Sequence, residues 1–377
     1  MTAYPAAGQR IKRLTPLADA LSTIDALVRP VEPREADVNA ALGRVLAADA
    51  ISPAAQPAVA LALRDGWAVK SGETTDAGSY APAPLSAMPA RVETGQPLPR
   101  GTDAVAPDET VVCRGKTAEA LAAVAPGEGV LPPGADIEAG GPLRRVGERL
   151  RMIDRAVLAA AGVLRVIVRE PRIRLVRARA GNAIAAGYDW FADAIASEGG
   201  AAIVDDTDAP AADHLEVALH HEASDAVVVL GGTGNGMSDM SVLTLAKVGR
   251  VEFHGVGLTP GETAGFGFAG ARPVLLLPGR MDATLAAWLV IGRHWLAKLA
   301  SCTEEETPVM AELTRKVTST VGMAEVVLVR RSGNSAEPLA SGYLPLSALA
   351  RADGWILVPA ESEGYPADAQ IAVRPLL

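Results

Sequence analysis

The stretch VVVLGGTGNGMSD, residues 227–239, joins four apolar residues to a loop with four glycines in six positions and ends at Asp239. The apolar, largely β-branched run predicts a strand, and the glycines predict a tight turn at its end. Successive backbone N–H groups without side chains can close around a phosphate or an oxyanion. The stretch therefore predicts an anion-binding loop at the carboxyl end of a strand.

Other interpretations of the loop stay open from spacing alone. A dinucleotide site needs G-x-G-x-x-G at the first turn of a Rossmann unit, whereas these glycines follow the third strand pattern of their domain. A phosphate P-loop needs G-K-S or G-K-T, which this stretch lacks. A glycine-rich turn that binds no ligand is the remaining alternative.

Strand and helix patterns alternate around the loop, which predicts an α/β domain with a parallel sheet covered by helices on both faces. Ligands bind such sheets at the carboxyl ends of the strands, so the loops after Leu230 and Leu277 should meet at one edge. The predicted strands are 172–178, 201–204, 225–232, 250–256 and 272–279, and the predicted helices are 182–199, 209–223, 241–249 and 282–300.

The flanking regions have different textures. Helical spacing predicts helices at 15–30, with Thr15 as N-cap and Pro16 at the first helical position, at 34–51 and at 152–163. Residues 52–142 are rich in Pro and Gly with short apolar runs, which indicates a small β-rich module. After Thr307 the pattern becomes all-β and indicates a small barrel or sandwich.

Composition excludes several functional classes. The net charge is −9, from 35 basic and 44 acidic residues, which argues against a nucleic-acid surface. No apolar run of transmembrane length and no signal-peptide core is present in the sequence, so we expect no membrane association. Cys113 and Cys302 are far apart and are expected to be free thiols of a cytoplasmic protein. The five histidines show no metal-ligand spacing.

The glycine loop resembles the S-G-G-V-S-V-G-x-x-D-Y pattern of the molybdopterin molybdenumtransferase family, the bacterial molybdate-insertion enzymes and the equivalent E domain of gephyrin. Gly231, Gly232, Gly236 and Asp239 coincide with it. Further blocks follow in the family's order. They are residues 41–69, with RDGWAV for the family's M-D-G-Y-A-V, 92–105 with TGQPLPRGTDAV, 131–150 with GADI, 251–267 with FHGVGLTPGETAGFG, and 345–364 with ADGWILVP.

The resemblance implies an elongated multidomain chain of class α/β plus β, with a doubly wound molybdopterin-binding domain. The implied domains are a linker domain (1–50 and 138–168), a β-rich inserted domain (51–137), an α/β domain (169–305) and a C-terminal β-barrel (306–377). It also implies a homodimer whose active cleft joins the α/β domain of one subunit to the β-rich domain of the other. The implied reaction inserts molybdate into adenylylated molybdopterin, with release of AMP and with Mg²⁺ on the phosphates.

The family's functional positions can be carried over residue by residue. The implied catalytic residues are Asp65, Thr94, Asp136, Asp205 and Asp239, of which Asp205 and Asp239 would also bind the metal. The implied substrate-binding residues are Gly231, Gly232, Thr233, Gly234, Gly236, Ser238, Pro278, Gly279 and Arg280. Asp and Thr also favour turns and caps, which is the alternative for each of them singly.

Other positions depart from the family pattern. In S-T-G-D-E-L the glutamate is missing near Ala183, and the lysines of K-P-G-K-P are replaced by Thr259 and Glu262. His254 stands at an upstream basic position and is expected to carry partial charge. In P-G-N-P the Asn becomes Arg280, which we hypothesise restores one cation. Two arginines of the family's C-terminal domain are gone, although Arg330 and Arg331 lie nearby in the sequence.

These gains and losses leave three hypotheses of different classes. The first is a divergent enzyme that inserts molybdate. The second is an impaired paralogue that binds molybdopterin or its cofactor as a carrier, with a molybdoenzyme or another cofactor-biosynthesis protein as partner. The third is a scaffold. Restoration of nitrate reductase activity in a strain that lacks the normal enzyme separates the first from the second.

Overall fold

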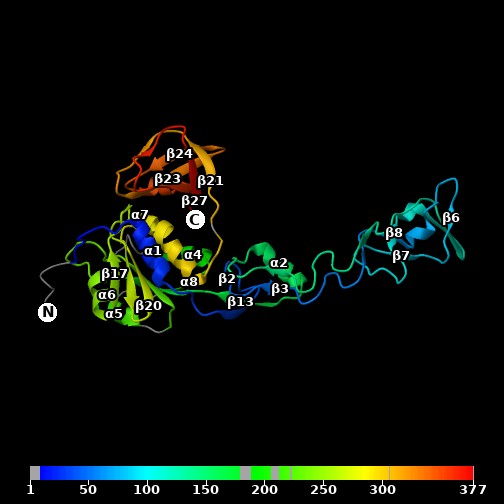
Figure 1. Ribbon diagram of the computed structural model, residues 1–377, viewed down its shortest axis with the longest axis horizontal. Helices are drawn as coiled ribbons and strands as arrows, with labels where there is room; N and C mark the ends of the chain where they lie inside the picture. Colours follow the sequence, from blue (N-terminus) through cyan, green and yellow to red (C-terminus); the bar gives the residue numbers. More distant parts are fainter. Residues whose placement is uncertain (1–8, 179–187, 205–211, 221–222, 305, 377) are drawn as a thin grey trace. The chain divides into compact units, whose positions relative to one another are not determined.

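The computed structural model describes residues 9–178, 188–204, 212–220, 223–304 and 306–376 (Figure 1). The chain divides into two compact units, and each is described by itself. Unit 1 comprises Met1–Ala48, Val146–Arg151 and Ile167–Leu377, and unit 2 comprises Asp49–Arg145 and Met152–Val166. The predicted Asp205 and the departures near Ala183 lie outside the described residues.

The α/β domain of unit 1 is built on a sheet with the strand order β15-β14-β16-β20-β19-β17. β14, β15, β16 and β20 are parallel, whereas β19 runs antiparallel to β20 and β17. The strands are β14 (Arg172–Arg177), β15 (Ala201–Val204), β16 (Ala226–Leu230), β17 (Arg250–His254), β19 (Gly265–Ala269) and β20 (Arg272–Leu277).

Both faces of this sheet are covered by helices, as the alternating pattern predicts. Val228 and Leu230 pack in one core with α1, α4, α7 and α8, and Val227 and Val229 pack in another with α5 and α6. Because successive strand residues point to opposite faces, the uninterrupted apolar run of β16 serves both cores. The helices are α1 (Leu17–Leu27), α4 (Tyr188–Ser197), α5 (Ala212–His220), α6 (Ser241–Val248), α7 (Met281–Ala287), the π-helical η3 (Trp288–Gly292) and α8 (Arg293–Ala300).

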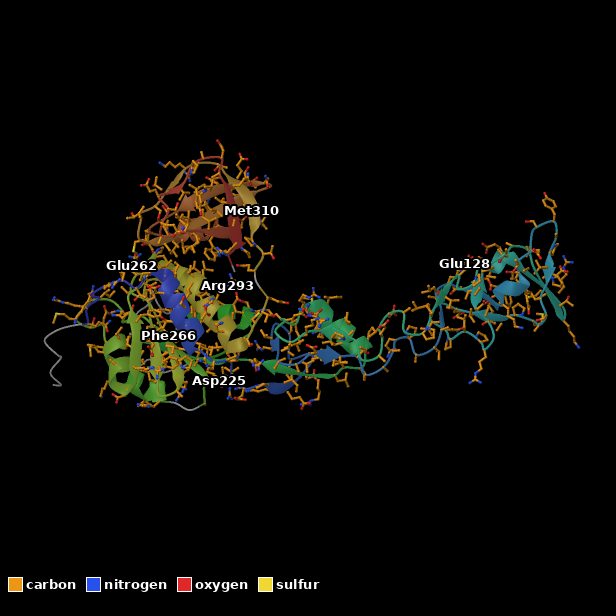
Figure 2. The ribbon with its side chains drawn as sticks, viewed as in Figure 1. Glu128, Asp225, Glu262, Phe266, Arg293 and Met310 are labelled. Carbon is orange, nitrogen blue, oxygen red and sulfur yellow. The ribbon has the colours of Figure 1, made fainter. Side chains whose placement is uncertain are left out.

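One prediction about the sheet is wrong, because the sheet is mixed rather than parallel. β19, with the sequence GFGFA, reverses direction between β17 and β20. Glycine counts against a strand in sequence reasoning. Here it allows close approach, since a Cβ on Gly267 would lie 2.2 Å from the carbonyl oxygen of Arg250. Phe266, labelled in Figure 2, fills the core between these glycines.

The predicted helix at 34–51 is also wrong. This segment forms β1 (Arg34–Asp37), β2 (Val45–Leu46) and β3 (Ala50–Ile51). The Asp37 carboxylate accepts a hydrogen bond from the Asn39 backbone N–H at 2.8 Å, and Gly43 has φ +77°. Pairing of β1 and β2 with β13 (Arg165–Arg169) overrides the helical propensity of the alanines.

Unit 2 contains the β-rich module, as predicted, together with the predicted helix α2 (Met152–Ala160). Its short strands carry small cores such as Val69, Ala104 and Val111. The strands are β4 (Leu61–Ala62), β5 (Gly66–Val69), β6 (Ala83–Pro84), β7 (Ala90–Val92), β8 (Ala104–Ala106), β9 (Val111–Arg114), β10 (Thr117–Ala120), β11 (Val130–Leu131) and β12 (Pro142–Arg144), with 3₁₀ turns η1 (Ser71–Glu73) and η2 (Asp108–Thr110).

The C-terminal region of unit 1 is a closed β-barrel, which decides between the barrel and the sandwich expected from sequence. β23, β24, β21, β27 and β25 pair in that order, and β25 pairs back to β23. β18 (Leu258–Thr259) from the α/β domain adds to β23. The elements are β21 (Val309–Leu313), β22 (Val317–Thr318), β23 (Ala324–Ser332), β24 (Ser335–Ala340), α9 (Leu346–Leu349), β25 (Gly354–Val358), β26 (Gly364–Tyr365) and β27 (Gln370–Pro375).

Two smaller sequence predictions have definite outcomes. Cys113 and Cys302 are both free thiols, as expected. The first helix begins one residue later than predicted, with Pro16 rather than Thr15 at the cap position. Among the described residues, no helix has the length and apolar character needed to cross a membrane.

Candidate active site

The glycine loop leaves the carboxyl end of β16 through two residues that require glycine. Gly231 has φ +86° and Gly232 has φ +66°. A Cβ on Gly232 would lie 2.5 Å from the Ser241 hydroxyl oxygen and 2.9 Å from the Ala178 Cβ. Both the left-handed backbone and the lack of space exclude other residues at Gly232. This explains physically why the leading glycine pair is retained.

The middle of the loop presents backbone donors. Among the described residues, no acceptor is found for the backbone N–H groups of Thr233, Gly234 and Asn235. The carbonyl oxygens that precede them are held. Gly232 O and Gly234 O accept hydrogen bonds from the Gln9 side chain, and Thr233 O is 2.8 Å from His254 Nε2. Such a run of oriented N–H groups is suited to an anion.

Asp239 closes the loop rather than projecting from it. Its Oδ2 accepts a hydrogen bond from the Gly236 N–H at 2.9 Å, and its own N–H donates to Gly236 O at 2.9 Å. A Cβ on Gly234 or on Gly236 would lie 2.8 Å from this Oδ2. The glycine that replaces the family's Ser at position 234 therefore allows the carboxylate to fold against the loop backbone.

Side chains of the loop divide into buried and exposed groups. Thr233 is 1% exposed, and its hydroxyl is 2.8 Å from the Thr263 hydroxyl, so its side chain is not available to a ligand. Ser238 is exposed. Burial lowers the pKa of His254 below its ordinary value, although the hydrogen bond to Thr233 O opposes this. The lowered pKa disfavours the charged form that was expected of His254, and its Nε2 donates to the Thr233 carbonyl as N–H.

The loop after β20 lies beside the glycine loop. Gly231 N donates to Leu277 O at 2.9 Å, and a Cβ on Gly231 would lie 3.5 Å from Gly279 Cα. Pro278 O accepts a hydrogen bond from the Thr284 hydroxyl at 2.5 Å, which fastens this loop to α7. The structure therefore brings the two predicted strand-end loops together.

Arg280 is fixed by partners from two domains of unit 1. Its Nε and Nη2 donate to the Asp282 carboxylate at 3.0 and 2.6 Å, and its guanidinium carbon lies 5.5 Å from the Tyr343 ring centroid. The hydrogen bond with Asp282 raises the pKa of Arg280. Burial raises the pKa of Asp282, but hydrogen bonding and charge from Arg280 bring it below its ordinary value. Nη1 makes no hydrogen bond within the described part of the chain, which leaves donors for a ligand.

A third loop, which carries Glu262, adds negative charge near Arg280. The half-buried Glu262, labelled in Figure 2, accepts hydrogen bonds from the Thr259 hydroxyl at 2.9 Å and from the Gly261 N–H at 3.2 Å. Its charge contributes to the raised pKa of Arg280, so the two groups interact electrostatically. The family's two lysine positions are thus occupied by a hydroxyl and a carboxylate that bond to each other.

Asp65 and Thr94, which are 29 positions apart in sequence, are brought together in unit 2. The Asp65 Oδ1 accepts hydrogen bonds from the Thr94 N–H at 2.8 Å and the Thr94 hydroxyl at 3.0 Å. These bonds, with the backbone bond contributing most, hold the pKa of Asp65 below its ordinary value. Both residues are exposed, so the pair is an ionised carboxylate open to solvent.

Among the described residues, the Asp136 side chain makes no hydrogen bond to either of these clusters. Asp136 is exposed in the turn before residue 137, where its backbone N–H donates to Gln56 O at 3.0 Å. Asp205 lies outside the described residues. Arg330 and Arg331 follow Glu325, the β18-paired residue of β23, by five and six positions, which is roughly 20 Å along a strand. Both therefore lie toward the opposite end of β23 from its pairing with β18.

The donor set bears on the expected metal. Within the described residues, no group of three or more His, Cys, Asp or Glu side chains is arranged to hold a metal ion. Asp239 Oδ2 is used by the Gly236 N–H, which leaves Oδ1 as the carboxylate oxygen able to coordinate. Mg²⁺ commonly binds through one or two carboxylates plus substrate phosphates, so this arrangement fits a metal that arrives with the substrate.

Sequence reasoning missed Gln9 at this site, as it missed the Asp282 and Tyr343 partners of Arg280. Gln9 is 5% exposed and joins the N-terminal segment to the glycine loop and to α6. Nothing in its surroundings, AAGQRIKRL, has a pattern that predicts such a contact, because the partners are more than 220 positions away.

Comparisons with known proteins agree along the chain. The MoeA N-terminal region (domain I and II) matches residues 15–162, a probable molybdopterin binding domain matches 186–298, and the MoeA C-terminal region (domain IV) matches 310–376.

Whole-chain relatives give the same result. A putative molybdopterin biosynthesis protein of Methanocaldococcus jannaschii is 26% identical over 392 residues, covering 94% of this chain and 96% of the relative. Molybdopterin molybdenumtransferase 2 of Mycobacterium tuberculosis is 24% identical over 394 residues, covering 93% and 96%. The crystal structure of a molybdopterin biosynthesis MoeA protein from Pyrococcus horikoshii superposes with a TM-score of 0.78 at 25% identity, covering 97% of this chain and 100% of that one. With its three consecutive regions matched and its fold shared over nearly the whole length, the chain belongs to the MoeA family.

Proposed function

We propose that this chain acts in molybdenum cofactor biosynthesis as a molybdopterin molybdenumtransferase, which inserts molybdate into adenylylated molybdopterin and releases AMP. The observation that carries the proposal is the convergence of three loops around oriented backbone N–H groups at the carboxyl end of the sheet. Relatives that cover 93% and 73% of this chain are named for this activity. The carrier alternative depended on the loss of family side chains such as the two lysines. The backbone N–H groups that we propose bind the anion do not depend on those side chains.

The residues have distinct roles in this proposal. The N–H groups of Thr233, Gly234 and Asn235 would receive an anionic group of the substrate, and Nη1 of Arg280 would supply a cationic donor. Asp65, held by Thr94, and Asp136 would act as carboxylates facing the substrate. Bound Mg²⁺ would offset phosphate charge, with Asp239 Oδ1 and the substrate phosphates as its ligands, and Asp205 as a further candidate.

The charge pattern predicts the rate. Glu262 and Asp282 place two carboxylates near Arg280. The family pattern has lysines at the positions of Thr259 and Glu262, so this chain has lost two cations and gained one anion in that loop. A missing oxyanion-stabilising donor typically costs about 2.7–4 kcal/mol in the transition state. We therefore propose an enzyme that is active but slower than relatives with both lysines.

The functional unit we propose is a homodimer in which the Asp65–Thr94 pair of one subunit and the glycine loop of the partner serve the same substrate. A cytoplasmic location, the pterin substrate and contact with a molybdoenzyme or another biosynthesis protein belong to the same proposal. The domain limits at residues 50, 137, 168 and 305 stay predictions.

A complementation assay tests the activity. The chain is expressed in a bacterial strain without its own molybdate-insertion enzyme, and nitrate reductase activity is measured at ordinary and at millimolar molybdate. Restoration at ordinary molybdate supports insertion. Restoration that is no greater than in the empty-vector strain, with the protein present in the extract, contradicts it.

A further inference from the structure

Gln9 uses its whole side-chain amide to connect three separate pieces of backbone. Nε2 donates to Gly232 O at 2.7 Å and to Gly234 O at 2.8 Å, and Oε1 accepts from the Val242 N–H at 3.1 Å. Both amide hydrogens are therefore engaged, and Val242 lies in the first turn of α6, where backbone donors lack helical partners. With 5% exposure, this amide is shielded from water.

The two carbonyls that Gln9 holds determine where the loop's donors point. In a trans peptide unit the C=O of one residue and the N–H of the next point in opposite directions. Fixing Gly232 O and Gly234 O toward Gln9 therefore turns the N–H groups of Thr233 and Asn235 away from it. His254 does the same for the intervening peptide by binding Thr233 O at 2.8 Å.

A loop with this sequence needs such restraint. Glycine has the largest conformational freedom of any residue, and four of the six residues from Gly231 to Gly236 are glycine. Without partners for their carbonyls, these peptides can rotate and turn their N–H groups away from a ligand. The glycines that permit the loop's shape therefore do not by themselves maintain it.

The segment that carries Gln9 is attached at further points, so its position is not incidental. The Ile11 N–H donates to Asn235 Oδ1 at 3.3 Å. The Thr15 N–H donates to Gly255 O at 2.9 Å, and a Cβ on Gly255 would lie 2.6 Å from Ile11 Cγ2. The stretch from Gln9 to Thr15 thus contacts both the glycine loop and the loop that follows His254.

We propose that Gln9 is a positioning residue of the active site, which orients the Thr233 and Asn235 N–H groups toward the anionic part of the substrate. It acts through the loop and does not itself touch the reacting atoms. The effect on catalysis rests on the proposed function, whereas the effect on the loop does not.

Two substitutions separate the bonds that Gln9 makes. In Gln9→Glu the ionised carboxylate still accepts from the Val242 N–H but repels Gly232 O and Gly234 O, and protonation at low pH returns one donor. In Gln9→Met a side chain of similar length loses all of these bonds. Gln370→Glu, at an exposed position of β27 where the amide lies 3.5 Å from the Glu312 carboxylate, is the control for the same Gln-to-Glu change outside the glycine loop.

Hydrogen exchange of the loop tests the geometry without any ligand. Relative to wild type at pH 8, the Gly236 amide, which donates to the Asp239 carboxylate, is expected to exchange about tenfold faster or more in Gln9→Glu, while the Val242 amide keeps its protection. In Gln9→Met the Val242 amide also loses protection. At pH 5 the Gln9→Glu ratio should return toward one. Loop exchange equal to wild type in both variants at pH 8 overturns the proposal.

Kinetics of AMP release test the catalytic consequence. The KM for adenylylated molybdopterin should rise about tenfold in Gln9→Glu at pH 8 and recover at lower pH, while Gln370→Glu matches wild type. An unchanged KM together with faster loop exchange overturns the positioning role. If wild type itself releases no AMP, the proposed function fails, and the exchange data still decide whether Gln9 holds the loop.

Discussion

The Asp65–Thr94 pair and the glycine loop solve the problem of holding a polar group in place by opposite means. In the pair, one side chain orients another, and the acting group is an exposed carboxylate. In the loop, the acting groups are backbone N–H donors, and the carbonyls behind them are held by the buried Gln9 and the half-buried His254.

The difference explains where this chain departs from its family pattern. A backbone donor does not depend on the identity of the side chain at its own position, so Val and Ser of the pattern can become Thr233 and Gly234 without loss of the N–H groups. A side-chain carboxylate has no such freedom, and Asp65 and Thr94 match the pattern in type. We infer that the changes at Thr259, Glu262 and Arg280 alter the charge of the site while the loop backbone keeps its shape.

The largest effect is expected from a substitution that distorts the backbone of the glycine loop. Gly232→Val places a Cβ against Ser241 and Ala178 and forces a left-handed backbone on a β-branched residue. The strained φ alone costs about 1–3 kcal/mol. We expect AMP release to fall by about 100-fold or more and the midpoint of thermal unfolding to decrease. Gly270→Ala, also at positive φ but with open space around its Cβ position, is the control and should keep near-normal activity. Activity within a few-fold of wild type in Gly232→Val would contradict the role that we assign to the backbone N–H groups of the loop.

The next effect tests the carboxylate side of the comparison. Asp65→Asn keeps an oxygen that accepts from Thr94 but removes the charge, so kcat/KM should fall by about 100-fold with little change in unfolding temperature. Thr94→Ser keeps both hydrogen bonds and should remain within a few-fold of wild type. Because the Thr94 bonds lower the pKa of Asp65, the carboxylate's contribution is present above the pKa of an unfolded Asp and is lost as pH falls through the lower folded value. An active Asp65→Asn enzyme at neutral pH contradicts the assigned role.

A smaller effect is expected from the charges around Arg280. Glu262→Gln keeps an acceptor for the Thr259 hydroxyl but removes a negative charge near the guanidinium. Molybdate affinity, measured by titration calorimetry, should increase by roughly three- to tenfold, since surface-proximal charges interact by a few kcal/mol at most. Arg280→Ala should weaken the same binding. Unchanged binding of molybdate and molybdopterin in Arg280→Ala eliminates the hypothesis that Arg280 restores a lost cation.

The smallest effect concerns the pH dependence of stability. Because the pKa of His254 in the folded chain lies below its ordinary value, His254 binds a proton more readily in the unfolded chain than in the folded one. His254 therefore contributes stability that is complete above about pH 6.5 and decreases as pH falls through the folded pKa. His254→Gln, which still donates to Thr233 O, should flatten urea-unfolding profiles in this range. A profile that superposes on wild type shows that His254 is not the group responsible.

The sequence predicts most of the sheet domain for a physical reason. β16 and β20 are uninterrupted apolar runs that can only be buried on both faces, and their ends locate the loops after Leu230 and Leu277. β19 could not be predicted from the sequence, because its glycines are required by the close approach of β17, and that approach is a tertiary contact. The strands at 34–51 escape because the pairing of β1 and β2 with β13, and of β3 with β12, outweighs local helical propensity.

The candidate site divides in the same way. Asp65, Thr94 and the glycine loop can be found from residue type and pattern, because each supplies its own chemistry. Gln9 and the Asp282–Arg280–Tyr343 contact cannot, since their importance arises from what folding places beside them. The lowered pKa of His254 likewise depends on burial, which the sequence around FHGV does not reveal.

The most direct test of the central claim is AMP release by the purified chain from adenylylated molybdopterin, followed as a function of molybdate concentration with Mg²⁺ present. The account predicts AMP release that saturates with molybdate and is abolished by Gly232→Val. Binding of adenylylated molybdopterin without any molybdate-dependent AMP release would contradict it.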